Sequence, residues 1–253
     1  MPAFGRSRAD WPMRQAWPLP ESPSPLLETG PFKLFTDGSL NTRTAWCYDE
    51  YPGSAGAGLP TYAPGELLAA ARDGVARGLA PHIHAIGDRA VTEAIDVFEQ
   101  LGVPGTIEHV QLIRDDDVPR LARLGLTASV QPEHAMDDRD VAERYWAGRT
   151  GRAFALRTLQ DAGVRLAFGS DAPVAPLDPW ITMAAAVTRT RDGRAPWHPE
   201  QALTPLEALA ASTHDHPGDL VVLDADPLDP ANLREMPVHA TLVAGEWTFG
   251  PYA

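Results

Sequence analysis

The sequence predicts an α/β fold built on a parallel sheet, and three observations support that prediction. From Phe32 onward, short apolar runs typical of strands alternate with segments of helical periodicity, as in consecutive βαβ units. Several of these runs end at a glycine- or acid-marked turn that carries a residue able to bind a metal. The 253 residues, of which 44% are hydrophobic, are enough for one sizeable core.

Five strands and the helices between them follow from this alternation. Helices are identified by apolar residues at helical spacing between a capping residue and a terminal glycine. The first expected strand begins at Phe32, and the third carries His109. The second, fourth and fifth span 80–85, 126–131 and 164–168. Six helices are expected. The second runs from an N-cap at Asp88 to Gly102, and the last begins at the capping box Thr204–Glu207. The other four span about 65–77, 116–124, about 152–162 and 179–190. The polar segment 133–144 is predicted to be a loop.

Changes in composition divide the chain into three parts. Residues 1–31 are rich in proline and lack periodicity, so we expect an extended or disordered tail. Residues 32–213 hold the alternating strands and helices. In residues 214–253 the period changes, and 219–224 and 238–247 are predicted to be two strands of a separate antiparallel sheet.

Charge and cysteine content exclude several classes of function. The formal net charge of -13 repels phosphate backbones and anionic lipids, so neither nucleic acid nor a membrane is an expected partner. Cys47 is the only cysteine, which excludes an intrachain disulfide and a thiolate-rich metal cage. The first 31 residues contain no apolar signal segment, and no run approaches the roughly 20 apolar residues of a membrane span. We therefore expect a cytoplasmic protein.

Four residues with metal-binding chemistry, Lys33, His84, His109 and Asp171, lie at or just after the predicted strands. The carboxyl ends of parallel strands meet at one edge of a sheet, so these side chains could converge there. Neutral imidazole and carboxylate suit zinc or a similar divalent ion. Either histidine alone could instead be a hydrogen-bonded core residue. Lys33 could extend to solvent, because it becomes a ligand only when it is deprotonated or converted to a carbamate.

The pair His82-x-His84 has a second interpretation, as a metal clamp on a first barrel strand. Alternation along a strand places both side chains on the same face. The separation between His84 and Asp171 is, however, about half or less of what seven βα units would need. We therefore interpret His82 as a neighbour of the ligand His84 rather than as a second ligand.

Three further residues are candidates for contact with a substrate. Gln131 and His134 follow the fourth predicted strand and could contact a substrate. The alternative interpretation is that they are ordinary polar residues of a loop. Arg43, together with Asp37, follows the first strand and could orient Lys33 or a substrate. A structural salt bridge is an equally good explanation for Arg43 and Asp37.

Five ordered motifs resemble the metal-dependent amidohydrolase superfamily, and most closely the branch that includes the N-substituted formamide deformylases. The resemblance runs from about Phe32 to the end of the chain. The motifs are Lys33 to Leu40 with Arg43 to Ala45, His84 to Ala90, Ile107 to His109, Ser129 to Pro132 and Gly169 to Pro173.

The resemblance implies a (β/α)8 barrel with a small β-sandwich, and it implies roles for the four candidate ligands. Lys33 would be the carbamylated ligand of strand four, and His84 and His109 the ligands of strands five and six. Asp171 would bind the metal after strand eight and transfer a proton. The implied reaction is hydrolysis of a carbon–nitrogen bond in a small amide by a metal-activated water, with zinc as the expected metal.

The family also begins with a strand ending in His-x-His and two further βα units, which do not precede Phe32. The resemblance therefore covers the carboxyl-terminal half only, and the expected fold is a partial barrel, about strands four to eight, with remnant β-sandwich strands. An inactive fragment is one alternative, and a half-barrel completed by a complementary chain or a homo-oligomer is another. A flavodoxin-like or receiver-like domain would also give five parallel strands.

Overall fold

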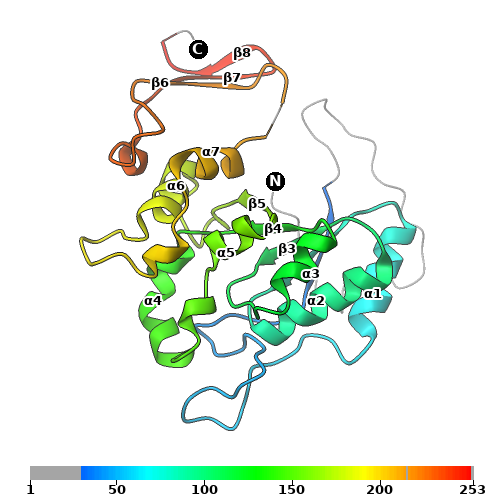
Figure 1. Ribbon diagram of the computed structural model, residues 1–253. Helices are drawn as coiled ribbons and strands as arrows, with labels where there is room; N and C mark the ends of the chain where they lie inside the picture. Colours follow the sequence, from blue (N-terminus) through cyan, green and yellow to red (C-terminus); the bar gives the residue numbers. More distant parts are fainter. Residues whose placement is uncertain (1–29, 215, 252–253) are drawn as a thin grey trace.

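The computed structural model describes residues 30–214 and 216–251, which form two sheets (Figure 1). The larger sheet has five parallel strands in the order β1-β2-β3-β4-β5, and the smaller has three antiparallel strands in the order β6-β7-β8. All five expected strands are present and lie beside their neighbours in sequence. The expected tail falls, except for its last two residues, outside the described residues.

The parallel sheet is made of short strands, each followed by helical segments. The strands are β1 (Phe32–Phe35), β2 (Pro81–Ala85), β3 (Thr106–His109), β4 (Thr127–Val130) and β5 (Arg165–Phe168). The helices are α1 (Glu66–Ala76), α2 (Asp88–Leu101), α3 (Val118–Arg123), α4 (His134–Tyr145), α5 (Leu156–Asp161), α6 (Pro179–Thr188) and α7 (Pro205–Ser212). Three short 3-10 helices, η2 (Thr150–Arg152), η3 (Pro199–Gln201) and η4 (Leu233–Glu235), lie between these elements or after them.

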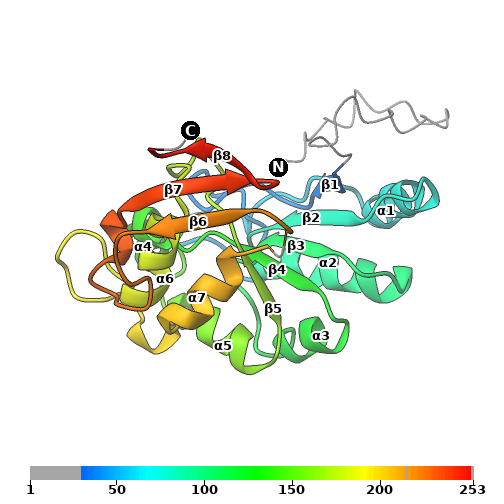
Figure 2. The same ribbon diagram turned by 90° about the horizontal axis from the view of Figure 1, so that it is seen from above.

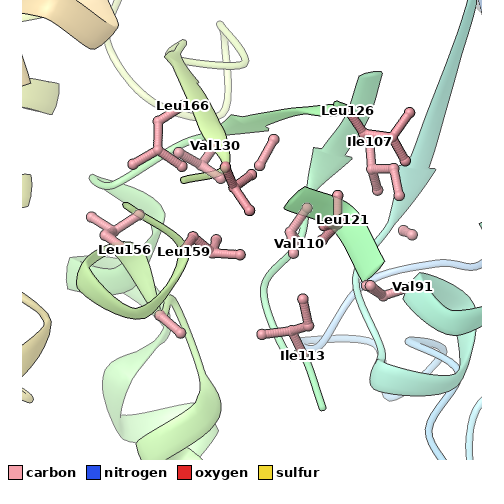
Figure 3. Close-up of a cluster of buried hydrophobic side chains, with 14 of the residues drawn as sticks. Val91, Ile107, Val110, Ile113, Leu121, Leu126, Val130, Leu156, Leu159 and Leu166 are labelled. Carbon is pink, nitrogen blue, oxygen red and sulfur yellow. The ribbon is translucent and has the colours of Figure 1, made fainter. Parts of the chain in front are cut away.

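One face of the parallel sheet is apolar and supports the core. A single row of paired residues crosses all five strands, and every member is buried: Leu34, Ile83, Ile107, Ala128 and Leu166. Helices α2, α3 and α5 lie along one side of the sheet (Figure 2). Their apolar side chains meet those of the strands in one cluster (Figure 3). Burial of this cluster, at roughly 25 cal/mol per Å² of apolar surface, is the main source of the stability of the fold.

The opposite face of the same sheet is polar. Because successive side chains of a strand alternate between faces, the residues between the apolar positions share this second face. One row pairs Phe35, His84, Glu108, Ser129 and Ala167, and the row beside it starts with Lys33 and His82. Parallel strands are usually apolar on both faces. The polar rows therefore distinguish this face from the apolar face that carries the core.

One segment differs in kind from the sequence prediction. Residues 133–144, predicted to be a loop, form most of helix α4. The buried side of this helix includes His134 and Asp138 together with Ala135 and Ala142, so its helical period is not visible as an apolar pattern. A helix whose buried side is partly polar shows no regular apolar spacing from which the sequence could predict it.

The ends of two other helices differ from the sequence prediction because of local backbone conformation. Gly87, not Asp88, is the N-cap of α2, and Asp88 is its first residue. The helix expected near 152–162 is interrupted, because Phe154 adopts φ 49° between η2 and α5. The capping box of α7 is confirmed, since Thr204 and Glu207 exchange both hydrogen bonds.

The antiparallel sheet contains one more strand than the sequence predicts. The segment 238–247, expected to be a single strand, contains β7 (Val238–Val243) and the start of β8 (Glu246–Phe249), and these pair with each other. Ala244 and Gly245 both have positive φ and form the two-residue turn between them. Strand β6 (Leu220–Leu223) completes the sheet, which lies next to α6 and α7 (Figure 1).

None of the helices in the described ranges 30–214 and 216–251 is both long and apolar enough to cross a bilayer.

Candidate metal site

Three side chains converge beyond the carboxyl ends of the parallel strands. His109 is the last residue of β3, His134 is the first residue of α4, and Asp171 follows β5. One ligand atom from each lies within 4.8 Å of the other two. Within the described part of the chain, these residues form a group that could hold a metal ion. They are delivered by different strand ends, as in other α/β proteins with sites at this edge.

The backbone at this site is in an unusual conformation. His109, Val110 and Asp171 all have positive φ, at 75°, 45° and 52°. This region is unfavourable for residues with a side chain, and especially for a β-branched residue such as Val110. Such conformations cost of order 1–3 kcal/mol each and cluster at functional sites. Their presence at the ends of β3 and β5, where the candidate ligands converge, supports a functional assignment.

The two histidines are buried and face each other. Their rings are stacked with centroids 6.0 Å apart and planes 17° apart, and each residue is 6% exposed. Nδ1 of His109, Nε2 of His134 and Oε1 of Gln131 are buried without a hydrogen-bond partner among the described residues. A buried polar atom left without a partner costs about 1–3 kcal/mol, so this cluster suits a ligand that would satisfy it.

Electrostatics keep His109 in the form that binds metals. Burial lowers the pKa of His109 well below its ordinary value, and the nearby charges of His84 and Lys33 lower it further. The imidazole is therefore neutral near pH 7 and retains a lone pair. Asp171, which is exposed, contributes a carboxylate oxygen. Nitrogen and oxygen donors of this kind fit zinc and other divalent ions.

His84 lies beside this group but not within it. Its ring is 4.6 Å from that of His109, centroid to centroid, at an interplanar angle of 71°. Nε2 of His84 is 3.2 Å from the carbonyl oxygen of Gly38 and 3.3 Å from Oδ1 of Asp37. One ring nitrogen thus already faces two acceptors, which leaves Nδ1 for any other ligand.

Lys33 occupies the polar face of the sheet, in register with His82. Its Nζ lies 5.3 Å from the centre of the Phe35 ring. Burial raises the pKa of Glu108, but hydrogen bonds from His82 and Ser129 and the charge of Lys33 outweigh it, so that the net pKa is lowered. The carboxylate of Glu108 is thus ionised on the same face as the Lys33 ammonium.

The three candidate substrate residues are divided between two regions. His134 is itself a member of the group, and Gln131 lies close enough to His109 to act on the pKa of that residue. Nε2 of Gln131 donates to the Ser129 carbonyl at 3.4 Å. Arg43 instead lies with its guanidinium 5.6 Å from the ring of Tyr145. The structure therefore brings His134 next to the predicted ligands His109 and Asp171. Sequence reasoning missed this because it treated His134 as part of a loop.

A sequence model of the amidohydrolase family matches residues 8–249. The chain belongs to this family. It is 29% identical to a putative amidohydrolase, YtcJ, of Bacillus subtilis, over 88% of this chain and 47% of that protein. It is 28% identical to the N-substituted formamide deformylase of Arthrobacter pascens, over 89% of this chain and 46% of the relative.

The structure resembles solved structures of metal-dependent hydrolases. It aligns with an uncharacterized metal-dependent hydrolase from Pyrococcus horikoshii at a TM-score of 0.67 and 37% identity. That alignment covers 72% of this chain and 38% of the other. The chain thus spans less than half the length of the curated relatives and solved structure named here, as expected for the carboxyl-terminal half of such a protein.

Proposed function

We propose that this amidohydrolase chain hydrolyses an amide-type carbon–nitrogen bond in a small molecule with the help of a divalent metal, with zinc as the first choice. The observation that carries the proposal is the convergence of His109, His134 and Asp171, with buried ring nitrogens that have no partner among the described residues. The name of one relative, an N-substituted formamide deformylase, makes N-substituted formamides the first substrates to test.

The roles of the residues follow from their positions. A bound divalent ion would activate a water molecule and polarise the substrate carbonyl. His109 and His134 would hold the ion through their unpartnered nitrogens, while Asp171 contributes an oxygen. Because Asp171 is exposed, its carboxylate can also accept a proton and pass it to the leaving amine. Gln131, whose Oε1 is unpartnered, is placed to orient a substrate N–H.

The proposal includes Lys33 and His84 as further ligands and a partial barrel as their frame. In this interpretation β1 to β5 are strands four to eight of a (β/α)8 barrel, residues 32–213 form the barrel part, and residues 214–253 belong to a remnant sandwich. The polar rows of the sheet would face the barrel interior. A carbamate on Lys33 would change its ammonium into an oxygen ligand.

Elemental analysis of the purified protein tests the metal directly. We expect zinc close to one equivalent or more in the wild-type protein, with a clear loss in Asp171→Ala and a smaller loss in Lys33→Ala. Asp140→Ala is a matched control, because Asp140 is an exposed carboxylate that pairs with Arg194. Zinc near zero in the wild-type chain, with added zinc not retained, would contradict the proposal. When the wild-type chain retains zinc, the zinc-loaded protein is assayed for hydrolysis of N-substituted formamides.

A second candidate is a half-barrel that acts only with a complementary chain or a second copy. Strands β1 and β5 are the edges of the parallel sheet, and unpaired edges are open to further strands. Several large apolar side chains of the small sheet are exposed, including Leu220, Val221 and Phe249. Sedimentation at several concentrations distinguishes the candidates. Activity of a strictly monomeric species would favour the first, and an inactive monomer that gains activity on association would favour the second.

A further inference from the structure

Asp37 is a buried carboxylate that connects three segments around His84. Its side chain is inaccessible to solvent. Oδ1 accepts a hydrogen bond from the backbone N–H of Ile86 at 3.1 Å and lies 3.3 Å from Nε2 of His84. Oδ2 accepts from the backbone N–H groups of Gly87 and Trp46, both at 2.8 Å. One side chain thus fixes the end of β2, the start of α2 and the loop after β1.

The surroundings of His84 define which of its ring nitrogens carries the proton. Both groups near Nε2, the Asp37 carboxylate and the Gly38 carbonyl, accept hydrogen bonds and cannot donate them. Nε2 must therefore be protonated. In the neutral ring Nδ1 then carries the lone pair, so Nδ1 is the nitrogen that can bind a metal. The backbone carbonyl of His84 is also held, since it accepts from N–H of Thr36 at 2.9 Å.

We infer that Asp37 is a positioning residue that holds His84 with Nε2 as the donor and so presents Nδ1 as its metal-binding atom. This inference rests on the proposed function for its purpose, but the orientation of His84 does not depend on a bound metal. A carboxylate that accepts from the second nitrogen of a ligating histidine fixes its ring and raises its affinity for the metal. Asp37 meets the geometric condition for that role.

Asp88 offers a matched comparison. It is also a buried carboxylate, is the first residue of α2 directly after the turn that Asp37 binds, and accepts a backbone N–H, that of Tyr48, at 3.0 Å. Its other oxygen lies 3.6 Å from the Arg152 guanidinium, and no contact joins it to His84 among the contacts of the described chain. Asp37→Asn and Asp88→Asn therefore both disturb a buried carboxylate, but only the first changes what His84 faces.

The first experiment uses the metal-free full chain and needs no activity. Two-dimensional ¹H–¹⁵N spectra at about pH 8, above the ordinary histidine pKa, report the tautomer of His84. We expect a protonated Nε2 and an unprotonated Nδ1 in the wild-type protein, and a shift toward protonated Nδ1 in Asp37→Asn. A wild-type ring protonated on Nδ1 would overturn the inference, and this measurement stands even when the variant does not fold.

The second experiment measures zinc affinity by competition with a chromophoric chelator. We expect Asp37→Asn to weaken binding about 10- to 100-fold, the range found for such partners. It should cause no further loss in a His84→Ala background, and Asp88→Asn should leave affinity unchanged. An equal loss in the His84→Ala background, or an equal loss in Asp88→Asn, would show a merely structural effect and overturn the inference. A wild-type chain that binds no zinc would contradict the proposed function, while the tautomer would still decide the role of Asp37.

Discussion

His109 and His134 lie with their rings nearly parallel, at a centroid distance of 6.0 Å, although one ends β3 and the other begins α4. Each has one buried ring nitrogen with no hydrogen-bond partner in the described chain. Two separate elements thus bring two unsatisfied donors or acceptors to one place. This is the arrangement expected of a site that is completed by a ligand.

The histidine pair predicts a direct role for His134 in metal binding. We expect His134→Ala to weaken zinc binding by at least about 10-fold, because it removes a proposed ligand and not merely a supporting partner. Competition with a chelator measures the change. His239→Ala is the control, since His239 is exposed on β7 and pairs with Asp224. Equal affinities of His134→Ala and the wild-type chain would exclude His134 from the site.

Gly87 predicts a strong steric effect close to the site. A Cβ atom at Gly87 would lie 2.1 Å from the carbonyl oxygen of Trp46, whereas a Cβ at Gly151 would meet nothing within 4 Å. We expect Gly87→Ala to lower the free energy of unfolding by about 2 kcal/mol or more, as overpacking does. Gly151→Ala should change it by less than about 0.5 kcal/mol. Urea denaturation of both variants makes the comparison, and similar stabilities would contradict the close approach.

The ion pair between Glu207 and Arg157 predicts a pH-dependent contribution to stability. Hydrogen bonds from Arg157 lower the pKa of Glu207 from 4.5 to about 2. Because the folded pKa is the lower one, the contribution is full above about pH 4.5 and is lost as the pH falls toward 2. We expect Glu207→Gln to cost about 1 kcal/mol at pH 7, a value reduced for partial exposure.

The pH dependence provides the check on that prediction. Urea denaturation of Glu207→Gln and the wild-type chain at several pH values should show curves that converge between pH 4.5 and about 2. A difference in stability that stays constant over this range would assign the effect to the capping box with Thr204 and not to the charge.

The polar face of the sheet predicts when Lys33 could carry a carbamate. The ionised Glu108 is close enough to interact with the charge of Lys33, and it would repel a second negative group. With ¹³C-labelled bicarbonate, we expect a carbamate signal only after zinc is added. Glu108→Gln should allow the signal without zinc, and Lys33→Ala should abolish it. A strong signal in the metal-free wild-type chain would contradict this electrostatic argument.

The sequence predicted the parallel sheet well because its signals are local. Apolar runs and terminal glycines define strands and helix ends without knowledge of their neighbours. Helix α4 was missed because its buried side includes His134 and Asp138, which only the tertiary structure identifies as inward-facing. The Ala244–Gly245 turn was missed because alanine rarely adopts positive φ.

The candidate site was predictable in part for the same reason. His109 and Asp171 were identified from their positions after strand-like runs, and the structure brings them together. The proximity of His134 depends on the turn between β4 and α4, and the orientation of His84 depends on Asp37, a residue of another segment. Such relationships are set by contacts distant in sequence, which a pattern along one chain does not contain.

The two faces of the parallel sheet have a consequence for how this protein can change over evolution. The apolar row from Leu34 to Leu166 is buried, whereas the row containing His84 and Glu108 belongs to the other face. Under the proposed function, substitutions in the polar row would alter ligands or substrate preference with little effect on the packing of the apolar face. A family built on such a sheet can acquire new substrates while its scaffold is inherited unchanged.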